Sequence, residues 1–179
     1  VIGTNEALRG INSVFGQVNL GFLDMIYLDL TARNDWSSTL PEGENSYFYP
    51  SAAASFIVSE LAAFENISAI DFLKVRASYA QVGNDAAPYR LVDVYNPITP
   101  NLNGLPRYGV PNSQNNPNLR PERTSEFEVG MDLRLFKGRL AFDFAYFDRS
   151  TKDQIFSVPA SASTGYTSRI TNAGEMRNW

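Results

Sequence analysis

The chain has 179 residues, of which 44% are hydrophobic, 13% aromatic and 19% charged, and its formal net charge is −4. This is not the composition of a disordered chain, and the absence of a long basic run argues against a nucleic-acid partner. The chain contains no Cys and no His, which excludes disulfides, thiol catalysis, Cys-based zinc sites and His acid/base chemistry. We therefore expect no enzyme, no cofactor and no metal site, and no apolar stretch approaches the roughly 20 residues of a membrane helix.

Alternation of apolar and polar side chains predicts two strands in the first part of the chain. Residues 13–22 and 26–33 each alternate with a period of two, and a short turn near residues 23–24 joins them. A helix would mix the two sets of side chains around its circumference, so strands are the better interpretation.

The same period recurs along the rest of the chain. Further alternating runs cover residues 51–58, 73–80, 126–135 and 140–147. The tight-turn signal Lys137-Gly138 joins the last two as a hairpin, and a final, truncated run begins near Arg169. These runs predict about seven strands, each on the order of 10 residues, which is close to the length that a tilted strand needs to cross a bilayer. Strands of globular proteins average about 5–6 residues.

The connections between these strands alternate in length. Those near residues 22–24 and 137–138 are short, and the segment 60–70 is compact and could hold a helical turn. The longer connections, rich in Pro, Asn and Gly, are residues 35–46, 84–122 and 157–168. In chain order the short connections fall at one end of the sheet and the long ones at the other, as in outer-membrane barrels.

The fold class that these observations predict is all-β, an antiparallel up-and-down transmembrane β-barrel segment. Lipid tolerates no open sheet edge, and about seven strands fall short of the even count of a bacterial barrel. Both ends look like cuts through something larger. We therefore expect residues 1–179 to be part of a barrel domain that needs further strands on both sides.

A soluble β-sandwich would also alternate, with apolar residues inside and polar residues outside. Three features favour the membrane barrel: the length of the strands, charges deep within strands such as Arg76 and Asp132, and aromatic residues near strand ends such as Tyr27 and Tyr146. Aromatic girdles lie at membrane interfaces because the ring has an apolar body and a polar tip. A sandwich would instead bury the row from Phe127 to Leu135 beneath a second sheet.

Five short motifs resemble those of TonB-dependent receptors of the SusC/RagA branch. In this sequence they are the runs 32–38 (ARNDWSS), 49–60 (YPSAAASFIVSE), 73–84 (LKVRASYAQVGN), 116–126 (NPNLRPERTSE) and 172–178 (NAGEMRN). They cover much of the chain and occur in the order of the family. Two departures are Ala80, where Gly is usual, and Phe56, where Trp is usual.

The resemblance implies a barrel of about 22 strands filled by a plug domain, which would lie outside this segment. It implies import of oligosaccharides or peptides across the outer membrane of a Bacteroidetes-like Gram-negative bacterium, with energy delivered through TonB. It also implies a SusD-like surface lipoprotein as partner, often in a dimer of such pairs. The residue pattern alone leaves a passive porin or structural barrel open, as well as a soluble β-sandwich adhesin.

Substrate-contact candidates lie mainly in the long connection 84–122, where aromatic faces with amide neighbours suit sugars or peptides. They are Trp36, Tyr89, Tyr95, Arg107 and Tyr108. The alternative is that the loop aromatics order the loop internally, and that Trp36 belongs to an interface girdle.

No catalytic residue is expected, although Glu126 and Glu128 share one strand face. Neighbouring charges such as Arg134 explain this pair more simply, as a solvated ion-pair network.

Overall fold

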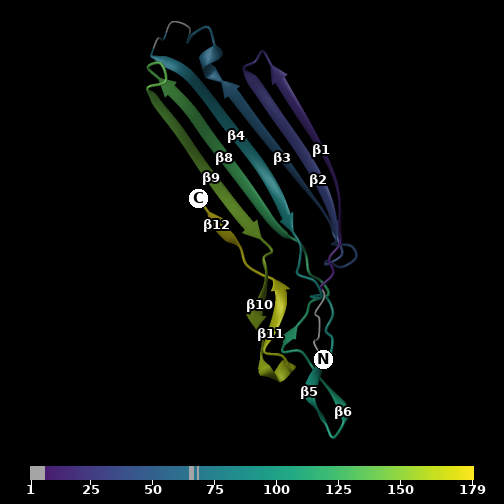
Figure 1. Ribbon diagram of the computed structural model, residues 1–179. Helices are drawn as coiled ribbons and strands as arrows, with labels where there is room; N and C mark the ends of the chain where they lie inside the picture. The colour runs from purple at the N-terminus through teal and green to yellow at the C-terminus, as the bar shows by residue number, and fades with distance from the viewer. Residues whose placement is uncertain (1–6, 65–66, 68) are drawn as a thin grey trace.

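The computed structural model describes residues 7–64, 67 and 69–179, and its main element is a seven-stranded antiparallel sheet (Figure 1). The strands follow the order β1-β2-β3-β4-β8-β9-β12. Their bounds are β1 Ile11–Phe22, β2 Ile26–Ser37, β3 Ser46–Ile57, β4 Ile70–Asn84, β8 Glu122–Leu135, β9 Leu140–Lys152 and β12 Met176–Asn178. Neighbours in the sheet are consecutive along the chain apart from the small elements between them, so the up-and-down prediction is confirmed.

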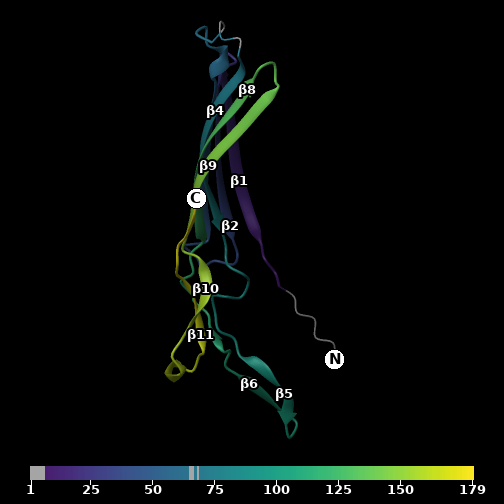
Figure 2. The same ribbon diagram turned by 90° about the vertical axis from the view of Figure 1, so that its left-hand side faces the viewer.

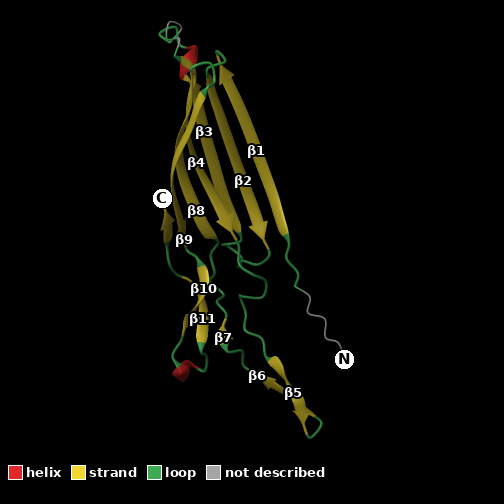
Figure 3. Cartoon of the chain, turned by 60° about the vertical axis from the view of Figure 1, so that its left-hand side comes forward, coloured by secondary structure: helices red, strands yellow, loops and turns green. Residues whose placement is uncertain are grey.

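The two ends of the sheet differ, as predicted (Figure 3). At one end, which we call the turn end, Met25 N donates to Phe22 O at 3.1 Å across a turn whose central residues Leu23 and Asp24 both have φ of 53°. Two central residues with positive φ match the right-handed twist of the flanking strands. The compact connection after β3 also lies here and begins with the 3-10 turn η1 (Val58–Glu60), while its residues 65, 66 and 68 are outside the described part.

At the opposite end, which we call the loop end, the long connections carry structure of their own. The connection 84–122 is not irregular throughout, because it contains the hairpin β5 (Asn96–Leu102) and β6 (Leu105–Gly109). It also supplies β7 (Ser113–Gln114), which joins β10 (Ile155–Pro159) and β11 (Ser168–Asn172) in a three-stranded sheet. A second 3-10 turn, η2 (Ala162–Thr164), lies between β10 and β11.

The predicted seventh strand was placed too early in the chain. The run near Arg169 is β11, which pairs with β10 and β7 at the loop end rather than with the large sheet. Its one large apolar residue, Ile170, is only 5% exposed and packs in a small core with Leu119. A turn at Gly174, with φ of 101°, then redirects the chain into β12, which pairs with β9.

The register across the large sheet separates a mainly apolar face from a face that carries the charges deep within the strands, with a few aromatic side chains such as Phe147 beside Glu128. Val129 lies opposite Ala77 on one side and Tyr146 on the other, and the next apolar row aligns Met131 with Val75 and Phe144. The same face continues through β3, β2 and β1, for example from Ala54 to Leu28 to Leu20. We call this the apolar face, and the opposite side, which carries Asp29, Arg76 and Asp132, the polar face.

The apolar face has no covering layer among the described residues. Side chains at its centre stay open, with Val18 52% exposed and Phe144 60% exposed, and an edge-on view shows a single sheet with the small elements beyond its end (Figure 2). The sandwich alternative required a second sheet over this face, and the described part of the chain does not supply one. Within that part, no helix is long and apolar enough to cross a membrane.

If the apolar face meets hydrocarbon, a charge placed on it should impair assembly. We expect Val129→Arg or Leu133→Arg in the full-length protein to cost roughly 2–4 kcal/mol near the bilayer midplane. Asp132→Asn, on the polar face of the same strand, is the matched control and should be mild. The measurement is the fraction of protein folded in the outer membrane, and equal tolerance of all three variants would contradict the face assignment.

Candidate functional site

The centre of the polar face is a compact ion-pair network around Arg76. Its guanidinium lies 2.9 Å from Asp132, 3.2 Å from Asp143 and 3.6 Å from Glu128, measured from nitrogen to carboxylate oxygen. The three carboxylates come from β8 and β9, so the network ties β4 to both. Arg134 is not part of it and lies 5.4 Å from the ring centroid of Phe72.

Gly130 makes room for this arginine. It is the register partner of Arg76, and a Cβ added to Gly130 would lie 2.5 Å from Arg76 Nε. Because real Cβ contacts are longer than this, any larger residue here must push the guanidinium away from its carboxylates. The absence of a side chain at Gly130 therefore leaves the space that the Arg76 guanidinium occupies in the ion-pair network.

The polar face also explains the two glutamates that sequence analysis set aside as non-catalytic. Glu126 accepts a hydrogen bond from Arg149 Nε at 2.5 Å, and Glu128 faces Arg76. The prediction of an ion-pair network is confirmed, but its cations are Arg149 and Arg76 rather than Arg134. Further along the face, Thr31 and Ser51 share a hydrogen bond of 2.6 Å. A charged, hydroxyl-lined surface of this kind suits an aqueous interior.

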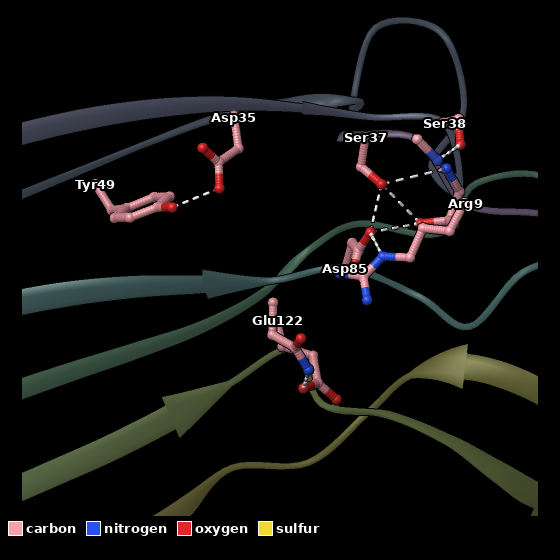
Figure 4. A network of polar contacts seen from close by, with 10 residues as sticks. Arg9, Asp35, Ser37, Ser38, Tyr49, Asp85 and Glu122 are labelled. Carbon is pink, nitrogen blue, oxygen red and sulfur yellow. Dashed lines mark hydrogen bonds and ion pairs between the residues drawn. The ribbon is translucent and has the colours of Figure 1, made fainter. Parts of the chain in front are cut away.

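At the loop end a second polar cluster is built on Asp85, whose side chain is 2% exposed (Figure 4). Its carboxylate accepts hydrogen bonds from Arg9 Nε at 3.0 Å, from Thr39 Oγ1 at 2.9 Å and from the Ser37 hydroxyl. A buried carboxylate needs such partners, because leaving it unpaired would be costly. Asp85 thereby fastens the end of β4 to the end of β2 and to the chain before β1.

Glu122 plays a similar role at the start of β8. It accepts a hydrogen bond from Asn84 Nδ2 at 2.9 Å and one from the backbone N–H of Ile155 at 2.7 Å. The ends of β4, β8 and β10 are therefore held together. Figure 4 shows Glu122 close to the Asp85 cluster.

A pocket of about 350 Å³ opens beside these two acids. Its lining includes Asp85, Arg90, Glu122, Phe156, Ser157 and Ile170. It combines a guanidinium, carboxylates, a hydroxyl and one aromatic ring, which are groups that hydrogen-bond and stack with polar substrates. Arg90, Phe156 and Ser157 were not predicted from the sequence. Arg90 lies in the connection after β4, and tertiary contacts such as the hydrogen bond from Ile155 N to Glu122 bring the start of β10 beside it.

The five predicted substrate-contact residues lie elsewhere, and they do not form one site. Tyr95 immediately precedes β5, and Tyr108 and Arg107 lie on β6 opposite Pro97 and Ile98. The β5–β6 hairpin therefore brings three of the five candidates together, on the element that extends farthest from the large sheet (Figure 3). Tyr95 and Tyr108 are 72% and 64% exposed, so their rings are open to a ligand.

Tyr89 and Trp36 are separate from that hairpin. The hydroxyl of Tyr89 accepts a hydrogen bond from Leu8 N at 3.3 Å, and its carbonyl accepts one from Asn115 Nδ2 at 3.3 Å. These contacts fit a residue that orders its own loop. Trp36 alternates with Asp35 along β2 and so belongs to the apolar face, where it is 41% exposed. That position agrees with the interface-girdle interpretation.

Comparison with known proteins identifies the family. Residues 3–179 match the family model described as TonB dependent receptor-like, beta-barrel. TonB-dependent receptor P26 of Formosa agariphila is 33% identical over 170 residues, and TonB-dependent receptor SusC of Bacteroides thetaiotaomicron is 25% identical over 174 residues. These alignments cover 94% and 93% of this chain but 17% of each relative, so the chain spans about one sixth of their length.

Solved structures give the same fold. The RagAB peptide importer in its closed-closed state superposes with a TM-score of 0.84 at 25% identity, covering 93% of this chain and 18% of that chain. The siderophore receptor PirA from Pseudomonas aeruginosa superposes with a TM-score of 0.62 at 17% identity, covering 94% of this chain and 29% of that chain. At that identity PirA supports the fold alone.

The fit between Gly130 and Arg76 can be tested by adding a side chain. We expect Gly130→Val in the full-length protein to displace the guanidinium from Asp132 and to lower the melting temperature by a few degrees. Gly16→Val is the matched control, because a Cβ at Gly16 meets nothing within 4 Å. The measurement is thermal unfolding in detergent, and equal melting temperatures for the two variants would show that Arg76 relaxes without cost.

The Asp85 cluster makes a separate prediction about the loop end. Asp85→Ala leaves the hydroxyls of Ser37 and Thr39 and the Arg9 guanidinium without their common acceptor, at a cost of about 2 kcal/mol. We expect faster protease cleavage of the connections 38–45 and 85–121 while the large sheet stays intact. Asp143→Ala, whose side chain is 70% exposed, is the control. Unchanged cleavage after Asp85→Ala would contradict the fastening role.

Proposed function

The chain belongs to the TonB-dependent receptor-like β-barrel family, and from that premise we propose that it forms part of the wall of an outer-membrane importer energised through TonB. The observation that carries the proposal is a sheet with one continuous apolar face and one charged face, which superposes on the RagAB peptide importer with a TM-score of 0.84. An apolar face without a cover suits contact with lipid, and a charged face suits a wet lumen.

Closure of the barrel requires more of the protein than this sheet. Among the residues that the structure describes, the outermost strands β1 and β12 each have a sheet neighbour on one side only. Backbone groups at such an edge have no water to bond within hydrocarbon. Further strands would therefore complete the wall on both sides, in a barrel of about 22 strands with a plug domain inside, and the described segment would be one part of that barrel domain.

The substrate class we propose is an oligosaccharide or a peptide. The polar loop-end pocket and the open tyrosines of the β5–β6 hairpin offer aromatic faces and hydrogen-bonding groups to such a molecule. Among the relatives, RagAB is named a peptide importer. The partners we propose are TonB on the inner side and a SusD-like surface lipoprotein on the outer side, in the outer membrane of a Bacteroidetes-like bacterium.

Uptake measurements distinguish an energised importer from a passive porin. Cells that carry the full-length gene should accumulate labelled oligosaccharide or peptide against a gradient, and deletion of TonB or collapse of the proton gradient should abolish this. A passive porin would leave entry unchanged under both treatments. Persistence of uptake without TonB would therefore overturn the proposal in favour of the porin.

The substrate-contact residues can be tested in the same cells. We expect the double variant Tyr95→Ala/Tyr108→Ala to raise the half-saturating substrate concentration several-fold while the protein level in the membrane stays constant. Trp36→Ala is the comparison, because its place on the apolar face predicts unchanged half-saturation. An unchanged value for the tyrosine variant would remove the hairpin from the substrate path.

A further inference from the structure

The apolar face changes character within about one row of side chains on β4, β8 and β9, since Asp148 of β9 already pairs with Phe127 of β8. On β8 the apolar side chains extend from Leu135 to Phe127 and then give way to Ser125 and Arg123. The rows continue across the sheet, since Ser125 pairs with Ser150 and Arg123 pairs with Lys152. At about 3.4 Å per residue the apolar stretch covers about 27 Å of strand, which for a tilted strand is close to the apolar band of about 25 Å in such barrels. The charged rows therefore begin where hydrocarbon ends.

Three cationic side chains converge in these rows, on the side of the wall that faces lipid. Arg123, Lys152 and Arg177 line one pocket of about 390 Å³, and the ring of Tyr79 borders it on the apolar side. Arg177 belongs to this face because it pairs with Ser150 in the register of β12 and β9. Since the pocket lies outside the sheet rather than within the lumen, a substrate in transit would not pass it.

The carboxylates in the pocket do not fully neutralise these cations. Arg177 binds Asp148, with 2.9 Å from Nε to Oδ1, and Lys152 Nζ lies 3.6 Å from Glu175. Both cations are more than half exposed, 60% for Arg177 and 64% for Lys152, and exposed ion pairs of this kind are weak. Arg123 has no ion pair within 4 Å among the residues that the structure describes. Glu126 also borders the pocket, but its side chain pairs with Arg149 on the polar face, so on the apolar face the three cations stand against the carboxylates of Asp148 and Glu175.

This arrangement matches the chemistry of a lipid phosphate. A guanidinium presents parallel N–H donors that suit phosphate oxygens, and an ammonium group adds a point charge. The hydroxyls of Ser125 and Ser150 supply further donors beside them. Immediately along the strands lie Tyr79, Phe127 and the apolar rows, along which acyl chains could extend. A free phosphate ion would use the charges but not the apolar rows.

We propose that the pocket between Arg123, Lys152 and Arg177 binds the phosphorylated headgroup of a lipid in the surrounding outer leaflet. Arg123 and Lys152 are the primary donors, because Asp148 already occupies one side of Arg177. The bound lipid would connect β8, β9 and β12 on their outer side. The proposal rests on the outward orientation of the apolar face and not on any transport activity.

The test uses the full-length protein in detergent, with lipid binding measured by native mass spectrometry. The probes are lipid A carrying phosphate, the same lipid A after enzymatic removal of phosphate, and inorganic phosphate. We expect phosphorylated lipid A to bind at least about tenfold more tightly than its dephosphorylated form, to lose affinity as salt rises, and to resist competition from millimolar inorganic phosphate.

Variants assign the binding to this pocket. Arg123→Gln/Lys152→Gln should remove most of the preference for phosphorylated lipid A, whereas Arg149→Gln, at a neighbouring level of β9 but on the polar face, should keep it. Equal binding of the two lipids, equal loss in both variants, or displacement by inorganic phosphate would each overturn the proposal. Uptake by the wild-type protein is measured in parallel, so that failure of lipid binding and failure of transport are seen separately.

Discussion

The constraint on which the structure depends is that backbone N–H and C=O groups in hydrocarbon must pair with one another. An antiparallel ladder meets it only if every strand continues through the full thickness of the membrane without a break. The six long strands, with 12 to 15 residues each, are long enough to do this. Once the ladder is continuous, the two-residue period decides which side chains face lipid and which face the interior, because successive side chains point to opposite faces of the sheet.

The polar face shows what a wet interior permits. Arg76 is one guanidinium among three carboxylates, and the site works because Gly130 offers no side chain in the space that the guanidinium occupies. On the apolar face the same strands carry apolar side chains from Leu135 to Val129 of β8 and in the rows that pair with this stretch. A single strand thus carries apolar side chains toward lipid and polar side chains toward water. A shift of register by one residue would move each set of side chains to the opposite face.

The large sheet was predictable because period, strand length and turn chemistry all act locally. Residues 126–135 and 140–147 show their pairing in the sequence itself, and the motifs at 73–84 and 116–126 identify the family. The loop end was not predictable in the same way. β11 has the alternation of a wall strand, yet burial of Ile170 beside Leu119 assigns it to the small sheet. The pocket beside Asp85 also depends on residues from β10 and β11 that only tertiary contacts bring there.

The buried cluster at the loop end gives the loops that extend beyond it a fixed base. Most described side chains of the large sheet are exposed or half-buried, whereas Leu40, Tyr47, Ala86, Leu119 and Ile170 form a small buried core where the long connections leave the sheet. Asp85 and Glu122 cross-link the strand ends around that core. Loops that begin from a fixed base lose less entropy when they order around a ligand. A fixed base therefore lowers the entropy cost of ordering the exposed β5–β6 hairpin around a ligand.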